Sequence, residues 1–213
     1  MTLVVFAGPS AGRLWTDWAA RDDVDMRLPA VRGDVASLVN SDQPGTLVLA
    51  DGAFDRSYAV GHRELLEAAS LGWRIIGVSS LGAIRATDLP GTGVRGVGQA
   101  YGYLVNTKAP DDHLALIYEP EPPFRIFAEA LFDVRQCLRD RALPAETGAI
   151  DAFLEDAARW WFGDRTRDQL QDRLETYVSA DRAAQLLAPL ASPLYNRAKQ
   201  LDLIDLMKEL LAR

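Results

Sequence analysis

The first ninety residues alternate short apolar segments with helix-like ones, and this alternation constrains the fold more than any other feature. Residues 2–7, 46–50 and 74–78 are apolar runs of strand length, and 25–28 is a shorter candidate strand. Helices are expected over 12–20, 35–40, 57–71 and 81–88, with Asp34 as the N-cap of the second. A repeated strand–helix order predicts a parallel sheet covered on both faces. The expected fold class is α/β, with three layers of the Rossmann or flavodoxin-like kind.

Three of these strands run directly into polar residues. The first leads into Gly8-Pro9-Ser10, the second into Asp51-Gly52, and the third into Ser79-Ser80. The carboxyl ends of parallel strands lie along one edge of the sheet, where open α/β sheets bind ligands. We therefore expect Ser10, Asp51 and the two consecutive serines to form one site.

The segment from Trp73 to Leu89 is the most informative of the three, because its strand passes straight into a helix. A hydroxyl at such a turn faces the unpaired amides of a helix start, which favour an anion or a developing oxyanion. The amides of Leu81 and Gly82 are the expected donors. The alternative for such a serine is a helix cap.

The strand–helix alternation ends near residue 90. Residues 90–112 have the composition of a loop, and 113–118 is a candidate strand. A proline-rich break at 120–123 follows, and beyond it apolar residues three and four apart predict helices over 124–138, 150–161, 167–178, 182–187 and 195–212. We expect an α/β core over 1–122 and a helical C-terminal region over 123–213.

Composition excludes several classes of function for this chain of 213 residues. The formal charge of −7 argues against nucleic acid as a partner, and no apolar run is long enough for a membrane span. Cys137 is the single cysteine, and the chain has two histidines, so neither a disulfide nor a metal site is expected. The first strand begins without a preceding basic segment, so we expect no signal peptide and a cytoplasmic location.

No cofactor is expected either. The sequence GTGVRG at 91–96 satisfies the G-x-G-x-x-G pattern, but it follows a helix and a proline instead of a strand. The dinucleotide fingerprint requires a preceding strand. A G-x-x-x-x-G-K-[ST] phosphate loop is absent from the sequence.

Five sequence blocks in order carry a family resemblance. They are GPS at 8–10, RGD at 32–34, DGAF at 51–54 with VGHRELL at 60–66, GVSSLGAIRA at 77–86, and GVRGVG at 93–98 with the acidic pair at 111–112. In order and spacing they resemble the TfuA family, accessory proteins to YcaO enzymes in peptide backbone thioamidation. The resemblance covers about residues 3–118, and residues 124–213 carry no matching motif.

The resemblance implies a hydrolase that releases sulfide from a ThiS-like sulfur-carrier protein ending in a thiocarboxylate. The YcaO enzyme would activate a backbone amide of the precursor peptide with ATP, and the sulfur would replace the amide oxygen. The resemblance also implies a serine–lysine pair, with Ser80 at the position of the serine and Ser79 as the second choice.

One departure from the family concerns the base. Arg63 stands at the family's lysine, and an arginine stays protonated and cannot take a proton from a serine. Lys108 is the only lysine of the α/β half and is the base that we favour. His62 is a further candidate.

Binding roles are expected for residues around this chemistry: Ser10, Arg32, Asp34, Asp51, Arg63, Glu64, Ser79 and Arg85. An arginine on the rim suits a carboxylate or thiocarboxylate. Structural alternatives exist, because Asp51 also fits an Asp-Gly turn, Arg32 and Asp34 a surface ion pair, and Arg85 an exposed helix position.

Two other functions remain open at this point. The chain could be a non-catalytic adaptor that docks the sulfur carrier and the precursor peptide to the YcaO enzyme, with Arg63 marking a lost base. It could also be a separate nucleotide- or small-anion-binding domain that uses the same rim.

Overall fold

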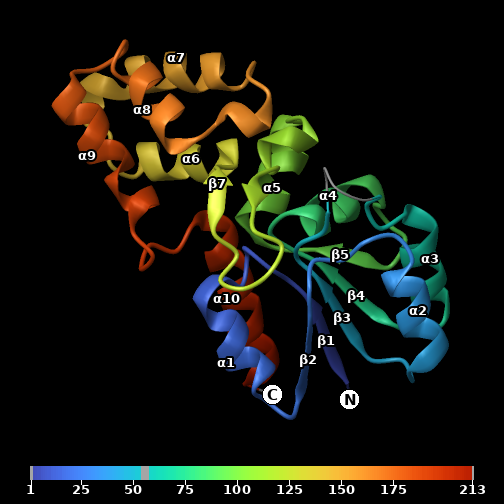
Figure 1. Cartoon of the computed structure of the whole chain (residues 1–213). Coiled ribbons are helices and arrows are strands. Elements are labelled where there is room, and N and C mark those ends of the chain that lie inside the picture. The colour runs from blue at the N-terminus through green and yellow to red at the C-terminus, as the bar shows by residue number, and fades with distance from the viewer. Residues whose placement is uncertain (1, 54–57, 213) are drawn as a thin grey trace. The chain divides into compact units, whose positions relative to one another are not determined.

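A parallel sheet forms the centre of the computed structural model, which describes residues 2–53 and 58–212. Within these residues the sheet has five strands in the order β2-β1-β3-β4-β5 (Figure 1). The strands are β1 (Leu3–Phe6), β2 (Val24–Arg27), β3 (Thr46–Leu49), β4 (Arg74–Gly77) and β5 (Val94–Gly96). Strands that are apolar on both faces need cover on both sides, and this favours the parallel arrangement. The α/β prediction is confirmed.

Helices cover both faces of the sheet, which confirms the three layers (Figure 1). On one face lie α2 (Asp34–Ser41), α3 (His62–Ser70) and α4 (Leu81–Asp88), and on the other lie η1 (Gly12–Leu14), α1 (Trp15–Ala19) and α10 (Ala198–Leu211). Successive residues of a strand point to opposite faces. Val4 therefore joins the core that contains Leu38 of α2, whereas Val5 joins the core that contains Leu203 of α10.

The stretch 90–112 corrects the loop prediction, because it contains β5, α5 (Gly98–Thr107) and the start of η2 (Asp111–His113). Helix α5 has no cap from its own neighbourhood. The carboxylate of Asp202 instead accepts hydrogen bonds from the backbone nitrogens of Gln99 and Ala100, at 2.8 and 2.9 Å. The residue that caps the start of this helix stands about a hundred positions later in the chain, so the local sequence gives no indication of it.

Two other boundaries differ from the expectation. Asp34 is the first residue of α2 and not its N-cap; Gly33, with a φ of 96°, holds the N-cap position. The region 124–138 begins with a strand, β7 (Ile126–Ala128), which pairs antiparallel with β6 (Ile117–Tyr118), and helix α6 starts only at Leu131. Helix α3 begins at His62, and residues 54–57 of the expected DGAF block and helix lie outside the described part.

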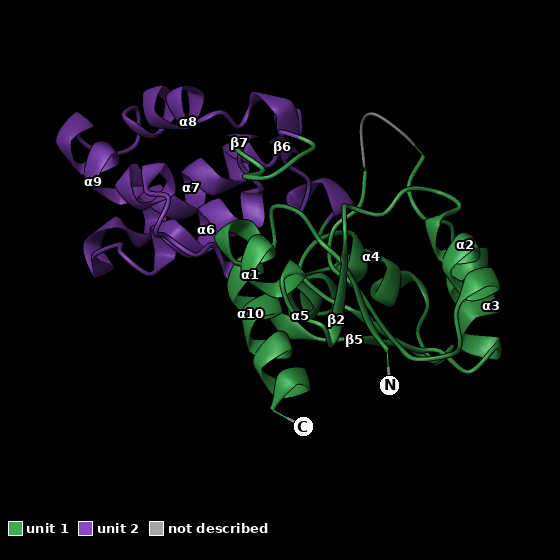
Figure 2. Ribbon diagram, turned by 60° about the horizontal axis from the view of Figure 1, so that its bottom comes forward, with its two compact units in different colours: residues 1–109, 120–125, 199–213 green, residues 110–119, 126–198 purple. Residues whose placement is uncertain are grey.

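The chain forms two compact units (Figure 2). Unit 1 comprises residues 1–109, 120–125 and 199–213, and unit 2 comprises 110–119 and 126–198. Besides β6 and β7, unit 2 contains α6 (Leu131–Arg139), η3 (Pro144–Glu146), α7 (Thr147–Ala157), η4 (Phe162–Asp164), α8 (Arg167–Leu174) and α9 (Ala180–Ala191). The last helix of the chain, α10, therefore belongs almost entirely to the unit that holds the sheet.

None of the helices in the described part of the chain has the length and apolar character needed to cross a membrane.

Candidate functional site

The strand order reverses between β1 and β3. The chain passes from β1 to β2 on one side and then returns to β3 on the other side. Open α/β sheets bind ligands at such a reversal of strand order. Ser10 follows β1 and Asp51 follows β3, so the topology brings both residues to the point of this reversal.

Asp51 holds the turn after β1 in place. Its Oδ2 accepts hydrogen bonds from the backbone nitrogens of Gly8 and Ser10, both at 2.8 Å, and its Oδ1 accepts one from Ser10 Oγ at 2.7 Å. The residue is only 3% exposed. Burial raises the pKa of the Asp51 carboxyl, while the bonds from Ser10 and Gly8 and the charge of Lys199 oppose this change. Asp51 thus connects two strand ends instead of merely completing an Asp-Gly turn.

The Ser79–Ser80 corner is joined to the same strand end. The backbone nitrogen of Ser80 donates to the carbonyl oxygen of Ala50 at 3.2 Å. Gly82 makes this close packing of α4 feasible, because a Cβ at this position would lie 1.6 Å from the carbonyl oxygen of Leu49. The expected gathering of Ser10, Asp51 and the two serines is therefore present in the structure.

The two serines have different surroundings. Ser79 has a left-handed backbone, with a φ of 64°, and its Oγ donates to the carbonyl oxygen of Lys199 at 2.8 Å. Ser80 is 5% exposed and occupies the N-cap position of α4, but its side chain makes no capping hydrogen bond. The hydroxyl proton of Ser79 is given to a carbonyl, which makes Ser79 less suited to act as a nucleophile.

The expected oxyanion donors are only partly retained. The backbone nitrogen of Gly82 donates to Ala50 O at 3.3 Å, so this amide already has an acceptor. Leu81 is the first residue of α4, and the first amides of a helix have no acceptor within the helix itself. Of the two donors predicted from the sequence, Leu81 is the one that fits an oxyanion.

Lys199 is a site residue that the sequence analysis missed. It is only 2% exposed, although lysines are rarely buried unless they have partners. Its carbonyl binds Ser79, and its charge acts on Asp51. A signal for it did exist, because Lys199 lies four residues before Leu203 and seven before Leu206, on the buried face of the predicted C-terminal helix.

His62 and Arg85 lie with Asp88 at the opposite end of α4. His62 Nε2 is 2.8 Å and Arg85 Nη1 is 3.0 Å from Asp88 Oδ2, and Arg85 Nε also donates to the Val60 carbonyl at 2.8 Å. An eight-residue helix is about 12 Å long, which separates this group from Ser80. Arg85 is thus a partly buried residue that ties α4 to the chain before α3.

Glu64 fastens two helix starts together. One carboxylate oxygen accepts from Gly33 N at 2.8 Å, before α2, and the other accepts from Gly61 N at 3.0 Å, before α3. Asp34 accepts from Val31 N at 2.7 Å and, within the described residues, forms no ion pair with Arg32. These two carboxylates therefore shape the loops beside the rim.

The remaining cationic candidates are exposed. Arg32 lies with its guanidinium over the ring of Tyr58, 4.7 Å from the centroid. Arg63 is exposed in the first turn of α3, and Lys108 is exposed at the end of α5, where its left-handed backbone (φ 56°) follows the helix.

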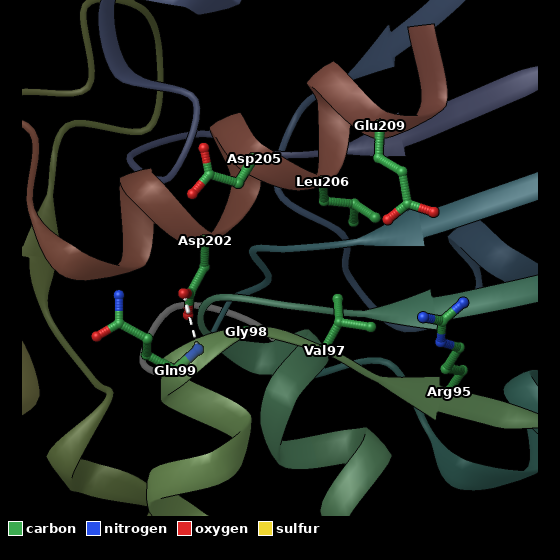
Figure 3. Close-up of a pocket in the computed structure, with 8 residues that line it drawn as sticks. All are labelled: Arg95, Val97, Gly98, Gln99, Asp202, Asp205, Leu206 and Glu209. Atoms are coloured by element: carbon green, nitrogen blue, oxygen red, sulfur yellow. Dashed lines mark hydrogen bonds between the residues drawn. The ribbon is translucent and has the colours of Figure 1, made fainter. Parts of the chain in front are cut away.

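A cavity of about 460 Å³ lies beside the start of α5 (Figure 3). Arg95 and Val97 contribute to one side, and Asp205 and Glu209 on α10 to the other. Asp202 already binds the first amides of α5 there, so this helix start is occupied by the protein's own carboxylate. The cavity therefore offers little for the binding of a phosphate.

Comparison with known proteins confirms the family that the motif blocks indicate, with different bounds. The GPS and RGD blocks lie outside the matched residues, whereas residues 124–166, for which no motif was recognised, lie inside them. The family model described as TfuA-like protein matches residues 51–166, which are 116 of the 213 residues. The match includes Asp51, both serines and Arg63, but neither Ser10 nor Lys199. A search of curated proteins found none that matches this chain. The chain belongs to the TfuA-like family, which is associated with YcaO enzymes in peptide backbone thioamidation.

Proposed function

We propose that this protein hydrolyses a thiocarboxylated, ThiS-like sulfur-carrier protein and so supplies sulfide to a YcaO enzyme. The observation that carries the proposal is the gathering of the Ser79–Ser80 corner, Asp51 and Lys199 outside the carboxyl ends of the strands. A serine near a basic group and a helix start is suited to nucleophilic attack on an acyl carbon. The thiocarboxylate of the carrier provides such a carbon.

The proposed reaction has two steps. Ser80 Oγ attacks the thiocarboxylate carbon, its proton passes through a basic group to the sulfur, and the carbon–sulfur bond breaks to release hydrosulfide. Water then attacks the resulting ester, which restores Ser80 and leaves the carrier with a carboxylate. In total, one water is consumed for each sulfide released. The Leu81 amide supports the negative charge on the oxygen during both steps.

Lys199 is the basic group that this mechanism uses. The mechanism requires Lys199 as the neutral amine, buried at the Ser79–Ser80 corner. When it takes the serine proton it becomes the charged ammonium, which acts on the Asp51 carboxylate. Arg63 is exposed in the first turn of α3 and, as an arginine, offers donors only. His62 is bound to Asp88 at the far end of α4. Lys108, which the sequence favours, is exposed at the end of α5.

Arg32 and Ser10 serve binding in this proposal. The loop that carries Arg32 adjoins the rim, because the backbone nitrogen of Ala30 donates to the carbonyl oxygen of Asp51 at 3.0 Å. The Arg32 guanidinium lies over the ring of Tyr58 and has donors suited to carboxylates of the carrier. The precursor peptide is then the substrate of the YcaO enzyme, which receives the sulfide.

The test mixes the purified protein with a thiocarboxylated carrier and follows the carrier by mass spectrometry, with released sulfide as a second readout. We expect the wild-type protein to convert the thiocarboxylate to the carboxylate, and Ser80→Ala to lose this activity by at least about a thousandfold. Ser70→Ala, which changes an exposed serine on α3, is the matched control and should keep it.

Each other outcome points to a different function. Carrier binding without turnover by the wild-type protein would support the adaptor, and undiminished turnover by Ser80→Ala would reject the serine mechanism. Tight binding of ATP to the isolated protein would support a nucleotide-binding domain instead.

A further inference from the structure

The hydroxyl of Ser79 connects the two residues that the proposed reaction uses. Its Oγ donates to the carbonyl oxygen of Lys199 at 2.8 Å, although 120 positions separate the two residues in the sequence, and Ser80 is the next residue along the chain. Consecutive Cα atoms are about 3.8 Å apart. One hydrogen bond therefore links the backbone beside the candidate nucleophile to the backbone of the candidate base, and all three residues belong to unit 1.

The backbone of Ser79 has a conformation that needs support from its surroundings. Its φ is 64°, in the left-handed region that residues with a Cβ rarely adopt, and the residue is fully buried. On the other side of this corner, the backbone nitrogen of Ser80 donates to the carbonyl oxygen of Ala50 at 3.2 Å. The corner is thus held from two sides, by the end of β3 and by α10.

The first turn of α10 is itself held by other parts of unit 1. Gln200 Nε2 donates to the Pro9 carbonyl at 2.9 Å, and the carboxylate of Asp202 caps the start of α5. These contacts tie the turn to the loop after β1 and to the residues that follow β5. The carbonyl of Lys199 therefore has a defined place, to which the Ser79 hydroxyl attaches the corner.

We propose that Ser79 is a positioning residue whose hydroxyl sets the location of Ser80 relative to Lys199. The two consecutive serines then have separate tasks, and Ser79 touches neither the carrier nor the reacting atoms. Its hydrogen bond uses the backbone carbonyl of Lys199 and does not involve the amine. The role in sulfide release rests on the proposed function, whereas the effect on the geometry of the corner does not.

The first experiment compares Ser79→Ala with Ser70→Ala in the full-length chain. Ser70 is the matched control, since its Oγ also donates to a backbone carbonyl, that of Glu67 at 2.7 Å, at an exposed position of α3. We expect Ser79→Ala to lower the kcat of sulfide release about tenfold and to leave KM for the carrier within about twofold, because only the alignment of the reacting groups changes. Ser70→Ala should match the wild-type protein in both.

Ser79→Gly separates the hydrogen bond from the strain of the backbone. Glycine adopts a positive φ without strain but carries no hydroxyl, so this variant should fold even if Ser79→Ala does not. If the bond sets the position, kcat falls about tenfold in Ser79→Gly as well. Thermal unfolding checks that each variant is folded, and full kcat in folded Ser79→Gly would overturn the inference.

A second readout does not need the carrier. An amine-reactive reagent followed by peptide mass spectrometry measures how fast Lys199 is modified, and this residue is buried in the wild-type protein. Without the bond from Ser79, the first turn of α10 should open more often. We therefore expect modification about fivefold faster in both Ser79 variants and unchanged in Ser70→Ala.

Equal modification of Lys199 in the Ser79 variants and the wild-type protein would overturn the inference. A loss of sulfide release in Ser79→Ala as large as that in Ser80→Ala would also overturn it, because Ser79 would then act in the reaction itself. Absence of sulfide release from the wild-type protein, combined with faster modification in the Ser79 variants alone, would reject the proposed function and retain the positioning role.

Discussion

The two ends of helix α4 carry polar residues that the sequence assigns to one site, yet they differ in burial. At the amino end, Ser79 and Ser80 are buried and joined to β3 and to α10, 120 residues further along the chain. At the carboxyl end, His62 and Arg85 each pair with Asp88 nearer the surface. Buried polar groups must be satisfied and are therefore held in one geometry, whereas exposed ion pairs contribute little. Motif membership alone does not separate these two kinds of residue, but burial does.

The largest effect expected from this difference concerns the lysines. Lys199→Met should lower sulfide release by at least about a hundredfold, because a general base contributes that much or more. Lys108→Met should stay within about twofold, since Lys108 is exposed at the end of α5. The measurement is the initial rate of sulfide release, with circular dichroism to show that both variants are folded. A loss confined to Lys108→Met would return the role of base to that residue.

A second comparison uses two helical glycines. Gly82→Ala should lower the free energy of unfolding by about 3 kcal/mol, because the new Cβ would collide with the backbone of β3 at the candidate site. Gly102→Ala meets no atom within 4 Å on α5 and should raise the same free energy by about 0.5–1 kcal/mol. Urea unfolding measures both. Equal effects of the two substitutions would show that the start of α4 is less tightly packed than described.

A third test concerns the two histidines, one exposed and one buried. His113 in unit 2 is buried, and burial lowers its pKa, with Arg165 and Arg135 adding to the decrease against Asp112. Below about pH 6.5 the unfolded chain takes up a proton that the folded chain does not. The free energy of unfolding should therefore fall as the pH drops from about 7 to 5, and His113→Gln should reduce this decrease. Urea unfolding at several pH values checks it, and an unchanged slope would contradict it.

Local signals account for the part of the fold that the sequence predicts well. Strands β1, β3 and β4 consist mainly of apolar residues. Helix α4 has the predicted bounds, since it starts soon after a strand and its end precedes Pro90. Helix α5 was not predicted, because the carboxylate that caps its start belongs to Asp202, far away in the sequence. Strand β7 escapes because its apolar spacing also fits a helix, and only its pairing with β6 decides between the two.

The candidate site divides in the same way. Ser10, Asp51 and the two serines are predictable, because a parallel sheet places all its strand ends along one edge. The position of Lys199 could not be predicted in this way, because it depends on α10 packing on the sheet although all of unit 2 precedes this helix in the sequence. A lysine on the apolar face of a predicted helix is nevertheless a visible anomaly, and it points to a buried charge that needs a partner.

The smallest effect is expected at the exposed end of α4. His62→Ala should change the free energy of unfolding by less than about 0.5 kcal/mol, because the half-exposed His62–Asp88 pair is screened by solvent and Asp88 keeps Arg85 as a partner. The rate of sulfide release should also stay within about twofold, since about 12 Å of helix separates this pair from Ser80. A double-mutant cycle with Asp88→Asn measures the coupling between the two side chains. Should His62→Ala abolish sulfide release while the protein remains folded, the two ends of α4 would have to form one site after all, and His62 would replace Lys199 as the group that takes the serine proton.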